Sequence, residues 1–198
     1  GVERCSPETG KGTDAMTRIF ASAAHGTYER PTGLTFPGVF ALLTKRHMHE
    51  HGTTEEQLAE VAVKNHRHGS LNSRAHFGKE TTVEEVLDGP IVADPFHLHD
   101  CCPFSDGAAA VVVASAEAAA ELDCDPVSVA GVGHATDVVP IADKAHPSMT
   151  QSARDAANRA YDIAGVDPEA VDVVEVHDCF TGAEVLATEA LGLIEEGE

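Results

Sequence analysis

The chain has 198 residues, of which 42% are hydrophobic, and 33 Asp or Glu against 13 Lys or Arg give a formal net charge of −20. This charge repels nucleic-acid backbones and anionic membrane surfaces, so neither is an expected partner. No apolar stretch approaches the roughly 20 residues of a transmembrane helix, and five cysteines without a CxxC pair favour a reducing cytoplasm. The acidic residues are distributed along the whole chain, which favours a protein that works at high salt, where screening reduces their mutual repulsion. An ordinary acidic cytosolic protein is the alternative.

The first half of the sequence predicts helices joined by loops. A short helix is expected at 14–24, and a second at 39–50 with Gly52 as its end. The stretch TTEEQLAEVAVKNHRHG begins with a Thr cap and has an apolar face, and a third cap of the same kind occurs near Thr81. Residues 25–90 therefore form a helical, loop-rich unit in this prediction.

The second half alternates between β-branched runs and amphipathic runs. The runs of small and β-branched residues are apolar on both faces, as strands of covered sheets are. The expected order is strand 108–114, helix 116–122, strand 127–136, helix 150–165, strand 171–177 and helix 181–192. This order predicts a layered α/β fold. Ligands of such sheets collect at the carboxyl ends of strands, where His177 is expected.

Four segments resemble one enzyme family. VDVVEVHDCFTGAEVLATEALGL closely resembles the HDCF segment of thiolases related to sterol carrier protein x. TFPGVFALLTKRHMHEHGTT, followed by VAVKNHRHGSLNSRAHF, is similar to the loop domain of archaeal acetyl-CoA acetyltransferases. CCPFSDGAAAVVVAS and GVERCS resemble two further strand regions of these enzymes, in family order.

This resemblance implies a partial thiolase fold of αβαβα layers with a helical loop-domain insertion. Residues 1–115 are expected to be the end of the N-terminal half, with the inserted loop domain at about 10–100. Residues 116–198 are expected to be the start of the C-terminal half. This chain is expected to contain fewer strands than the whole fold, so apolar strand edges should be exposed. The chain is therefore expected to be poorly soluble or to recruit its missing parts.

The implied activity is acyl transfer on coenzyme A thioesters, with no covalently bound cofactor. Relatives join two acetyl-CoA into acetoacetyl-CoA, or reverse this reaction, through a cysteine acyl-enzyme. The match of His177 to the first residue of the family motif implies that it contributes to the oxyanion hole for the enolate. A histidine at a strand end, as a rigidly placed N–H donor, is consistent with that role. Asp178 is a candidate to orient the imidazole, although adjacent strand residues normally point to opposite faces.

The same resemblance suggests residues that contact the acyl-CoA substrate. Cys179 matches the motif but is expected to pack as a small buried hydrophobe. Gly131, with Gly133, allows close approach of a ligand or, equally, of a packing partner. The full set of expected acyl-CoA contacts is Phe36, Pro37, Gly38, Gly131, Met149 and Phe180, and Phe180 also fits a core position.

Three catalytic groups of the family find no match in this sequence. The nucleophilic cysteine is expected before Gly1, and the GHP histidine and CxG cysteine after Glu198. The chain alone is therefore expected to be inactive. Relatives also suggest a homodimer or tetramer, and association with hydroxymethylglutaryl-CoA synthase through a small bridging protein.

Three other readings stay open at this point. Twelve histidines, with His47 and His51 four apart and HLHDCC at 97–102, suggest a metal site, but exposure on a helix explains His47 without one. No metal is therefore expected. A thiolase-like scaffold that binds acyl-CoA without catalysis, and a thiolase for longer 3-oxoacyl chains, are the functional alternatives.

Overall fold

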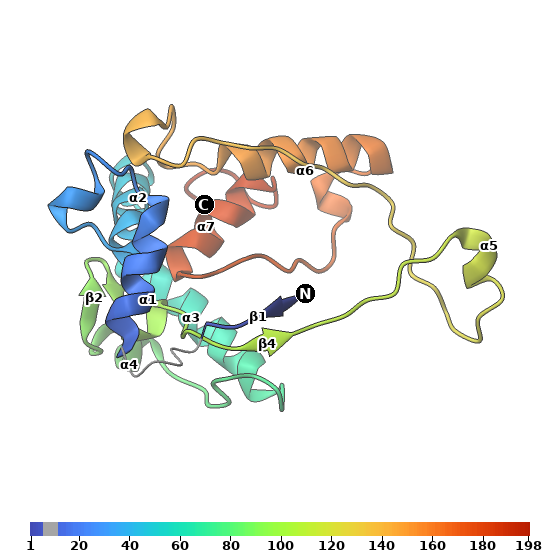
Figure 1. Cartoon of the computed structure of the whole chain (residues 1–198), viewed down its shortest axis with the longest axis horizontal. Helices are drawn as coiled ribbons and strands as arrows, with labels where there is room; N and C mark the ends of the chain where they lie inside the picture. The colour runs from blue at the N-terminus through green and yellow to red at the C-terminus, as the bar shows by residue number, and fades with distance from the viewer. Residues whose placement is uncertain (6–11) are drawn as a thin grey trace.

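A cluster of helices forms the body of the computed structural model, which describes residues 1–5 and 12–198 (Figure 1). Helix α3 contacts both α4 and α7, and α2 also packs on α7. The members of the cluster are α2 (Phe36–His51), α3 (Glu55–Ser70), α4 (Val83–Leu87) and α7 (Thr181–Ala190).

Threonine caps set the starts of three of these helices. The side chains of Thr35, Thr54 and Thr82 each accept a hydrogen bond from a backbone N–H in the first turn of the helix that follows. The last two form complete capping boxes with Gln57 and Glu85. The two helices predicted from caps near Thr54 and Thr81 are confirmed, and so is the helix expected at 39–50, which begins three residues earlier behind Thr35.

The core lies where α7 crosses α2 and α3. Gly182 of α7 faces Thr44 of α2 so closely that a Cβ at position 182 would meet the threonine side chain. The main buried apolar cluster joins residues that are far apart in the sequence, namely Ala41, Leu58, Phe96, Cys179, Phe180 and Ala183. The helical region before residue 100 and helix α7 therefore share one core, across the expected boundary near residue 115.

The other elements are short except α6. The helices are α1 (Gly12–Phe20), α5 (Ala116–Ala119) and α6 (Gln151–Ala164), and the 3-10 turns are Ala21–Ala23, Arg30–Thr32, Leu98–Asp100, Ile141–Asp143 and Pro168–Ala170. Strand β1 (Val2–Glu3) pairs antiparallel with β4 (Gly107–Ala108), and β2 (Ile91–Ala93) pairs antiparallel with β3 (Phe96–His97). Of the described helices, none is long and apolar enough to cross a bilayer.

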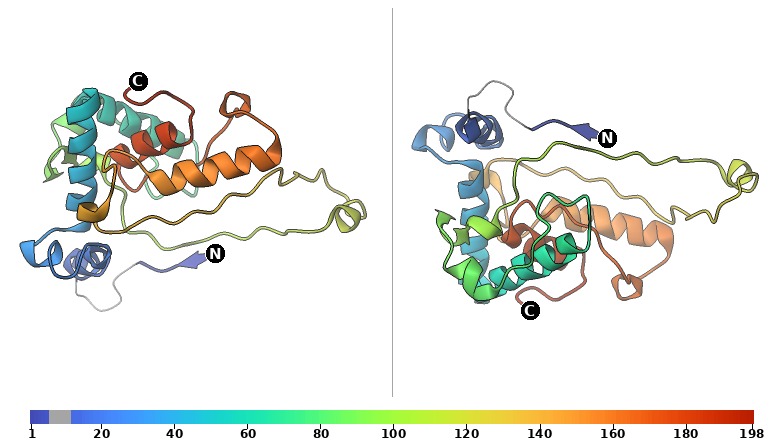
Figure 2. Two further views of the ribbon diagram at one scale, coloured as in Figure 1. Left: turned by 90° about the horizontal axis from the view of Figure 1, so that it is seen from above. Right: turned by 90° about the horizontal axis from the view of Figure 1, so that it is seen from below.

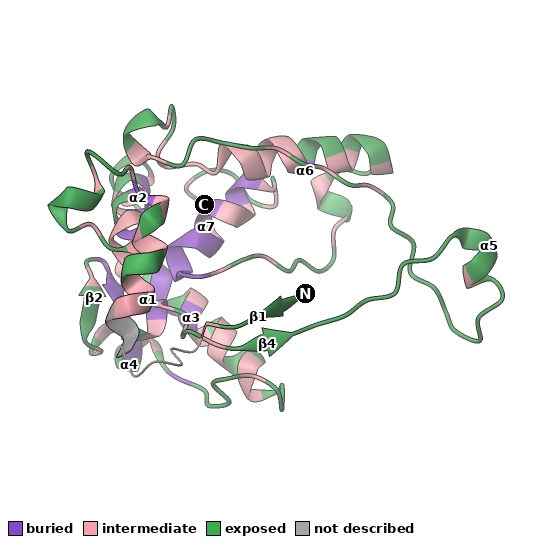
Figure 3. Cartoon of the chain, viewed as in Figure 1, coloured by how far each residue is buried: buried purple, intermediate pink, exposed green. Residues whose placement is uncertain are grey.

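The predicted layered sheet is not formed within the described residues. Only β4 remains of the strand expected at 108–114, and the segments 127–136 and 171–177 are extended without pairing into strands. Most of their residues are exposed (Figure 3). A strand exists only as part of a hydrogen-bonded ladder, and these segments lack a neighbouring strand. The prediction of buried strands was therefore wrong for the chain as it stands, whereas the prediction of exposed apolar edges agrees with the structure.

Candidate functional site

The HDCF segment lies directly before α7 and is tied to the loop after the Leu98–Asp100 turn. The backbone N–H of Cys102 donates to the carbonyl of Cys179 at 3.1 Å. The hydroxyl of Thr181 donates to Asp100 Oδ1 at 2.8 Å, and the other carboxylate oxygen accepts from the backbone N–H of His97 at 2.8 Å. The start of α7 and the residues just before it are thus fixed by contacts with residues 97–102.

Asp178 is held by the amide of a residue on α3. Asn65 Nδ2 donates to Asp178 Oδ2 at 2.7 Å and to Glu184 Oε2 at 2.8 Å, so one amide group bridges two carboxylates. Lys64 forms an ion pair with the other oxygen of Glu184. Burial is the main cause that raises the pKa of the Asp178 carboxyl, and Glu184 raises it further. We call the four residues Lys64, Asn65, Asp178 and Glu184 the carboxylate clasp.

His177 lies on the open side of this segment. The residue is exposed, and no hydrogen bond of its ring is found within 1–5 and 12–198. Its ring does interact electrostatically with the Asp178 carboxylate, which partly offsets the rise in the pKa of that group caused by burial. The carboxylate of the adjacent Asp178 is bound by Asn65 instead. The expectation that Asp178 orients the imidazole stays a prediction; the structure adds that Asn65 anchors this carboxylate beside His177.

Phe180 is a core residue in this structure. It is buried and stacks on Phe96 with 5.2 Å between ring centroids and 7° between ring planes. Phe40 and Phe36 contact the same ring at 5.0 and 5.8 Å. The sequence allowed Phe180 both a core position and a place in the acyl pocket, and the described contacts are those of a core position.

The other expected substrate contacts lie apart from one another. Pro37 and Gly38 are in the first turn of α2, beside Phe36, where Gly38 N–H donates to the Thr35 hydroxyl at 3.2 Å. Met149 is half-buried in the turn before α6, with its N–H bonded to the His146 carbonyl. These residues do not line the pocket described below.

Gly131 and Gly133 lie against helix α6. A Cβ on Gly131 would collide with the carbonyl oxygen of Ala160, and one on Gly133 with that of Ala156. The backbone approach that these glycines permit is therefore to helix α6, whereas the alternative to a ligand raised from the sequence was close packing of strands.

A pocket of about 220 Å³ opens between α3 and the HDCF segment. Its polar lining comes from Asn65, Asp100, Asp178, Thr181 and three histidines, His66, His76 and His99. The buried Nδ1 atom of His99 has no hydrogen-bond partner among the described residues. His66 stands between Phe77 and His99, with ring centroids 5.9 and 5.1 Å away. A neighbouring pocket of about 290 Å³ shares these three rings. The first pocket therefore combines an apolar wall with convergent histidine, amide and carboxylate groups.

The cysteines near this pocket are poor nucleophiles. Burial raises the pKa of Cys101 and of Cys179 to about 12, and it also raises the pKa of Cys102. Since the thiolate is the attacking species, a raised pKa suppresses reactivity at neutral pH. Cys179 is buried, as expected for a packing residue.

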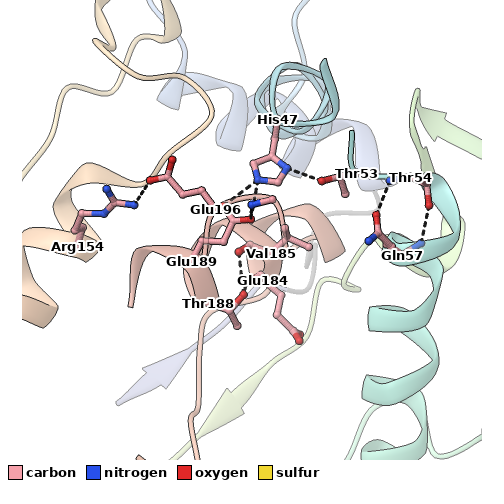
Figure 4. Close-up of polar contacts among 11 residues, drawn as sticks. His47, Thr53, Thr54, Gln57, Arg154, Glu184, Val185, Thr188, Glu189 and Glu196 are labelled. Carbon is pink, nitrogen blue, oxygen red and sulfur yellow. Dashed lines mark hydrogen bonds and ion pairs between the residues drawn. The ribbon is translucent and has the colours of Figure 1, made fainter. Parts of the chain in front are cut away.

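His47 is buried, contrary to the expectation of an exposed helix position. Its ring points from α2 toward α7, where Nε2 donates to the Glu189 carboxylate at 2.9 Å, and Nδ1 is hydrogen-bonded to the Thr53 hydroxyl at 2.9 Å (Figure 4). Both ring nitrogens are therefore used within the protein. In the part of the chain that the structure describes, no group of His, Cys, Asp or Glu has an arrangement that could hold a metal ion.

Sequence reasoning did not single out the residues of the carboxylate clasp other than Asp178. Asn65 and Lys64 belong to the KNH stretch that resembles the family, so the motif contained a signal for them. Glu184 had no signal, because an acidic residue in the first turn of a helix is ordinarily exposed and favoured by the helix dipole.

Comparison with known proteins matches residues 133–198 to the family described as thiolase C-terminal domain-like. Over 95% of its length the chain is 42% identical to an acetyl-CoA acetyltransferase of Methanothermobacter thermautotrophicus, of which the match covers 50%. Over 82% of its length it is 36% identical to sterol carrier protein 2 of Oryctolagus cuniculus, of which the match covers 30%.

A solved structure described as an Ltp2-ChsH2(DUF35) aldolase has a similar fold. Its TM-score is 0.83 with 28% identity, and the match covers 98% of this chain and 50% of that one. The chain thus spans half the length or less of these three proteins.

Proposed function

Because this chain belongs to the thiolase superfamily, we propose that it forms part of an acyl-CoA acyltransferase that condenses two acetyl-CoA into acetoacetyl-CoA, or catalyses the reverse thiolysis. The observation that carries this proposal is the 42% identity to an acetyl-CoA acetyltransferase over 95% of the chain, including the HDCF segment. The proposed fold is the layered αβαβα arrangement with its loop-domain insertion, of which the described helices form one part. Cytoplasmic location, dimers or tetramers, and a complex with hydroxymethylglutaryl-CoA synthase belong to the same proposal.

In this proposal a cysteine thiolate attacks the carbonyl of one acetyl-CoA and expels free CoA, which leaves an acetyl-enzyme. A base removes the α-proton of the second acetyl-CoA, and the enolate carbon attacks the acetyl-enzyme and releases the cysteine. None of Cys101, Cys102 and Cys179 suits the role of the nucleophile, because burial raises the pKa of each. Since none of the five cysteines, Cys5 and Cys124 included, lies in a sequence context that resembles the family's nucleophile, we place the proposed nucleophile in the part of the relatives that this chain does not match.

His177 is the proposed donor to the enolate oxygen. It is exposed, without a hydrogen-bond partner among the described residues, and next to a backbone fixed by Asp178 and Asn65. An oxyanion hole accelerates a reaction through donors that are held in place before the charge develops. The anchored carboxylate of Asp178 supports such a placement of the neighbouring His177 in the whole enzyme.

A chimera tests this proposal. The matched 190 residues of the Methanothermobacter enzyme are replaced by this chain, and CoA-dependent cleavage of acetoacetyl-CoA is measured. We expect activity in the chimera, a loss of about 100- to 1,000-fold in kcat for His177→Ala, and little change for the exposed control His68→Ala. If kcat of the His177→Ala chimera equals that of the unsubstituted chimera, His177 has no part in catalysis. A folded chimera without activity would favour the scaffold reading.

An aldolase is the second candidate, because the solved structure with a TM-score of 0.83 is described as one. An aldolase cleaves a carbon–carbon bond without acyl transfer to CoA. Cleavage that continues in the absence of free CoA would therefore identify an aldolase. A 3-oxoacyl-CoA thiolase would instead require CoA and prefer longer acyl chains.

A further inference from the structure

A single amide group on α3 is bonded to two carboxylates near the start of α7. Both views in Figure 2 show α3 (teal) beside α7 (red). Asn65 Nδ2 has two N–H groups, and it donates to Asp178 Oδ2 at 2.7 Å and to Glu184 Oε2 at 2.8 Å. These contacts span 113 and 119 residues of the chain. The donors of the amide are thus used at the junction between the HDCF segment and α7.

Helix formation does not explain an asparagine at position 65. Asn is one of the poorer residues for a helix interior, because its side chain competes for backbone hydrogen bonds. Position 65 lies well inside α3, and the residue is half-buried rather than solvated on an outer face. The physical reason for this side chain therefore lies outside its own helix, in the two carboxylates to which it donates.

The amide holds Asp178 without adding charge to the site. Lys64, the preceding residue, forms an ion pair with the other oxygen of Glu184. Within the carboxylate clasp, two carboxylates thus share one ammonium group, and the hydrogen-bond donor to Asp178 is uncharged. A cation at position 65 would instead neutralise the second carboxylate. An asparagine fixes the position of the Asp178 carboxylate and leaves the charge balance of the clasp unchanged.

The groups that face the Asp178 carboxylate come from both helices and from the loop at Cys102. Burial is the main influence on the pKa of Asp178; Glu184 of α7 raises the pKa further, whereas Lys64 of α3 and the adjacent His177 lower it. Burial, and after it the charge of Asp178, raises the pKa of the Cys102 thiol. Asp178 therefore lies where α3, α7 and the Cys102 loop meet, and Asn65 decides to which of them it is bonded.

The direction of Asp178 sets that of His177. Residues 171–177 are extended, and successive side chains of an extended chain point to opposite sides. With the Asp178 carboxylate bound to α3, the side chain of His177 is turned to the other side of the segment. The next residue is tied to the Cys102 loop, because the Cys102 N–H donates to the Cys179 carbonyl at 3.1 Å. Asn65 is therefore the contact from α3 that fixes the residue next to His177.

We propose that Asn65 is a positioning residue of the acyl-transfer site, which holds Asp178 against α3 and thereby sets the direction of the His177 ring toward the enolate oxygen. This inference rests on the proposed function, in which His177 donates to that oxygen. Asn65 acts through Asp178 rather than on the reacting atoms. The role belongs to the hydrogen bond between an amide and a carboxylate, so a residue of the same shape without N–H groups cannot replace it.

Substitution of the amide by a carboxylate tests this role. Asn65→Asp keeps the size and shape of the side chain but replaces the N–H donors by an acceptor. In the chimera with the Methanothermobacter enzyme, we expect kcat to fall about 10- to 100-fold while KM for acetoacetyl-CoA changes less than about twofold, as for a contact that matters only in the transition state. The matched control is Asn72→Asp, because the Asn72 side chain accepts from the Arg74 N–H at 3.0 Å and a carboxylate can retain that bond.

Exchange of the two partners separates the hydrogen bond from the individual residues. When Asn65→Asp is combined with Asp178→Asn, the amide lies at position 178 and the carboxylate at position 65, so the same hydrogen bond forms in reverse. We expect kcat of this double variant to lie within about fivefold of that of the unsubstituted chimera. In urea unfolding of the chain 1–198 alone, the unfolding equilibrium constant of the double variant should be at least about threefold smaller than the two single effects predict together.

Several results would overturn this role for Asn65. One is a kcat of Asn65→Asp equal to that of Asn72→Asp, another is a raised KM with unchanged kcat, and a third is a double variant no more active than Asn65→Asp. If Asn65→Asp does not fold, an inactive double variant overturns the role. Additive effects on unfolding would contradict the hydrogen bond itself. Inactivity of the unsubstituted chimera would reject the proposed function and this role together, whereas an active chimera that tolerates Asn65→Asp rejects this role alone.

Discussion

Asp178 lies half-buried between α3 and α7, with Asn65 as its hydrogen-bond donor. Burial raises the pKa of its carboxyl above the ordinary value of 3.8, so the folded state binds this proton more tightly than the unfolded state. The resulting stabilisation is complete below the unfolded pKa and is lost as pH rises through the folded pKa. We therefore expect the free energy of unfolding of Asp178→Asn, relative to the unsubstituted chain, to increase as pH rises above about 4.

Urea unfolding at a series of pH values measures this difference. The matched control is Asp172→Asn, in which an exposed carboxylate six residues earlier is removed. The free energy of unfolding of this control, plotted against pH, should run parallel to that of the unsubstituted chain. Parallel curves for Asp178→Asn as well would contradict the raised pKa.

At the scale of elements, the crossing of α2 and α7 depends on Gly182. A Cβ at this position would meet the Thr44 hydroxyl and lie 2.9 Å from its Cγ2. We expect Gly182→Ala to lower the free energy of unfolding by about 1–3 kcal/mol, because the helices must separate to accept the methyl group. Adding Thr44→Ala removes both obstructing atoms and should restore part of the loss.

Chemical denaturation of the single and double variants checks this expectation. Gly78→Ala is the control, since nothing lies within 4 Å of a Cβ there. If the change in the free energy of unfolding of the double variant equals the sum of the two single changes, the expected contact between positions 182 and 44 is contradicted.

For the whole molecule, the net charge sets the response to salt. The excess of 33 acidic over 13 basic side chains makes the folded state repel itself. Raising NaCl from 0.1 to 1 M shortens the screening length from about 10 to about 3 Å, so we expect the midpoint of thermal unfolding to rise. The exposed ion pairs, such as Lys45–Asp94, weaken with salt but contribute little.

Circular dichroism at increasing NaCl concentration measures the midpoint, with sucrose at equal osmolality as the control for solvent exclusion. A midpoint that is constant or falls with salt would argue against self-repulsion as the dominant electrostatic effect. The expectation of a protein suited to high salt would then lose its physical basis.

Local chemistry along the chain was sufficient to predict the helices. The threonines at 35, 54 and 82 cap the helices that follow them, and Gly52 and Gly165 end theirs with positive φ angles of 81° and 67°. These signals act within a few residues, so they can be read without knowledge of the fold. The HDCF and KNH stretches likewise predicted the family and included Asp178 and Asn65.

Only the tertiary structure decided which residues share a site and which strands form. It brought Asn65 and Glu184 to Asp178, buried His47 against Glu189, and placed Phe180 on Phe96. The β-branched runs of the second half have strand sequences, yet they remain unpaired here because a strand needs hydrogen bonds from a neighbour. A helix satisfies its backbone within itself, whereas a strand and a clasp of side chains depend on residues that are distant in the sequence.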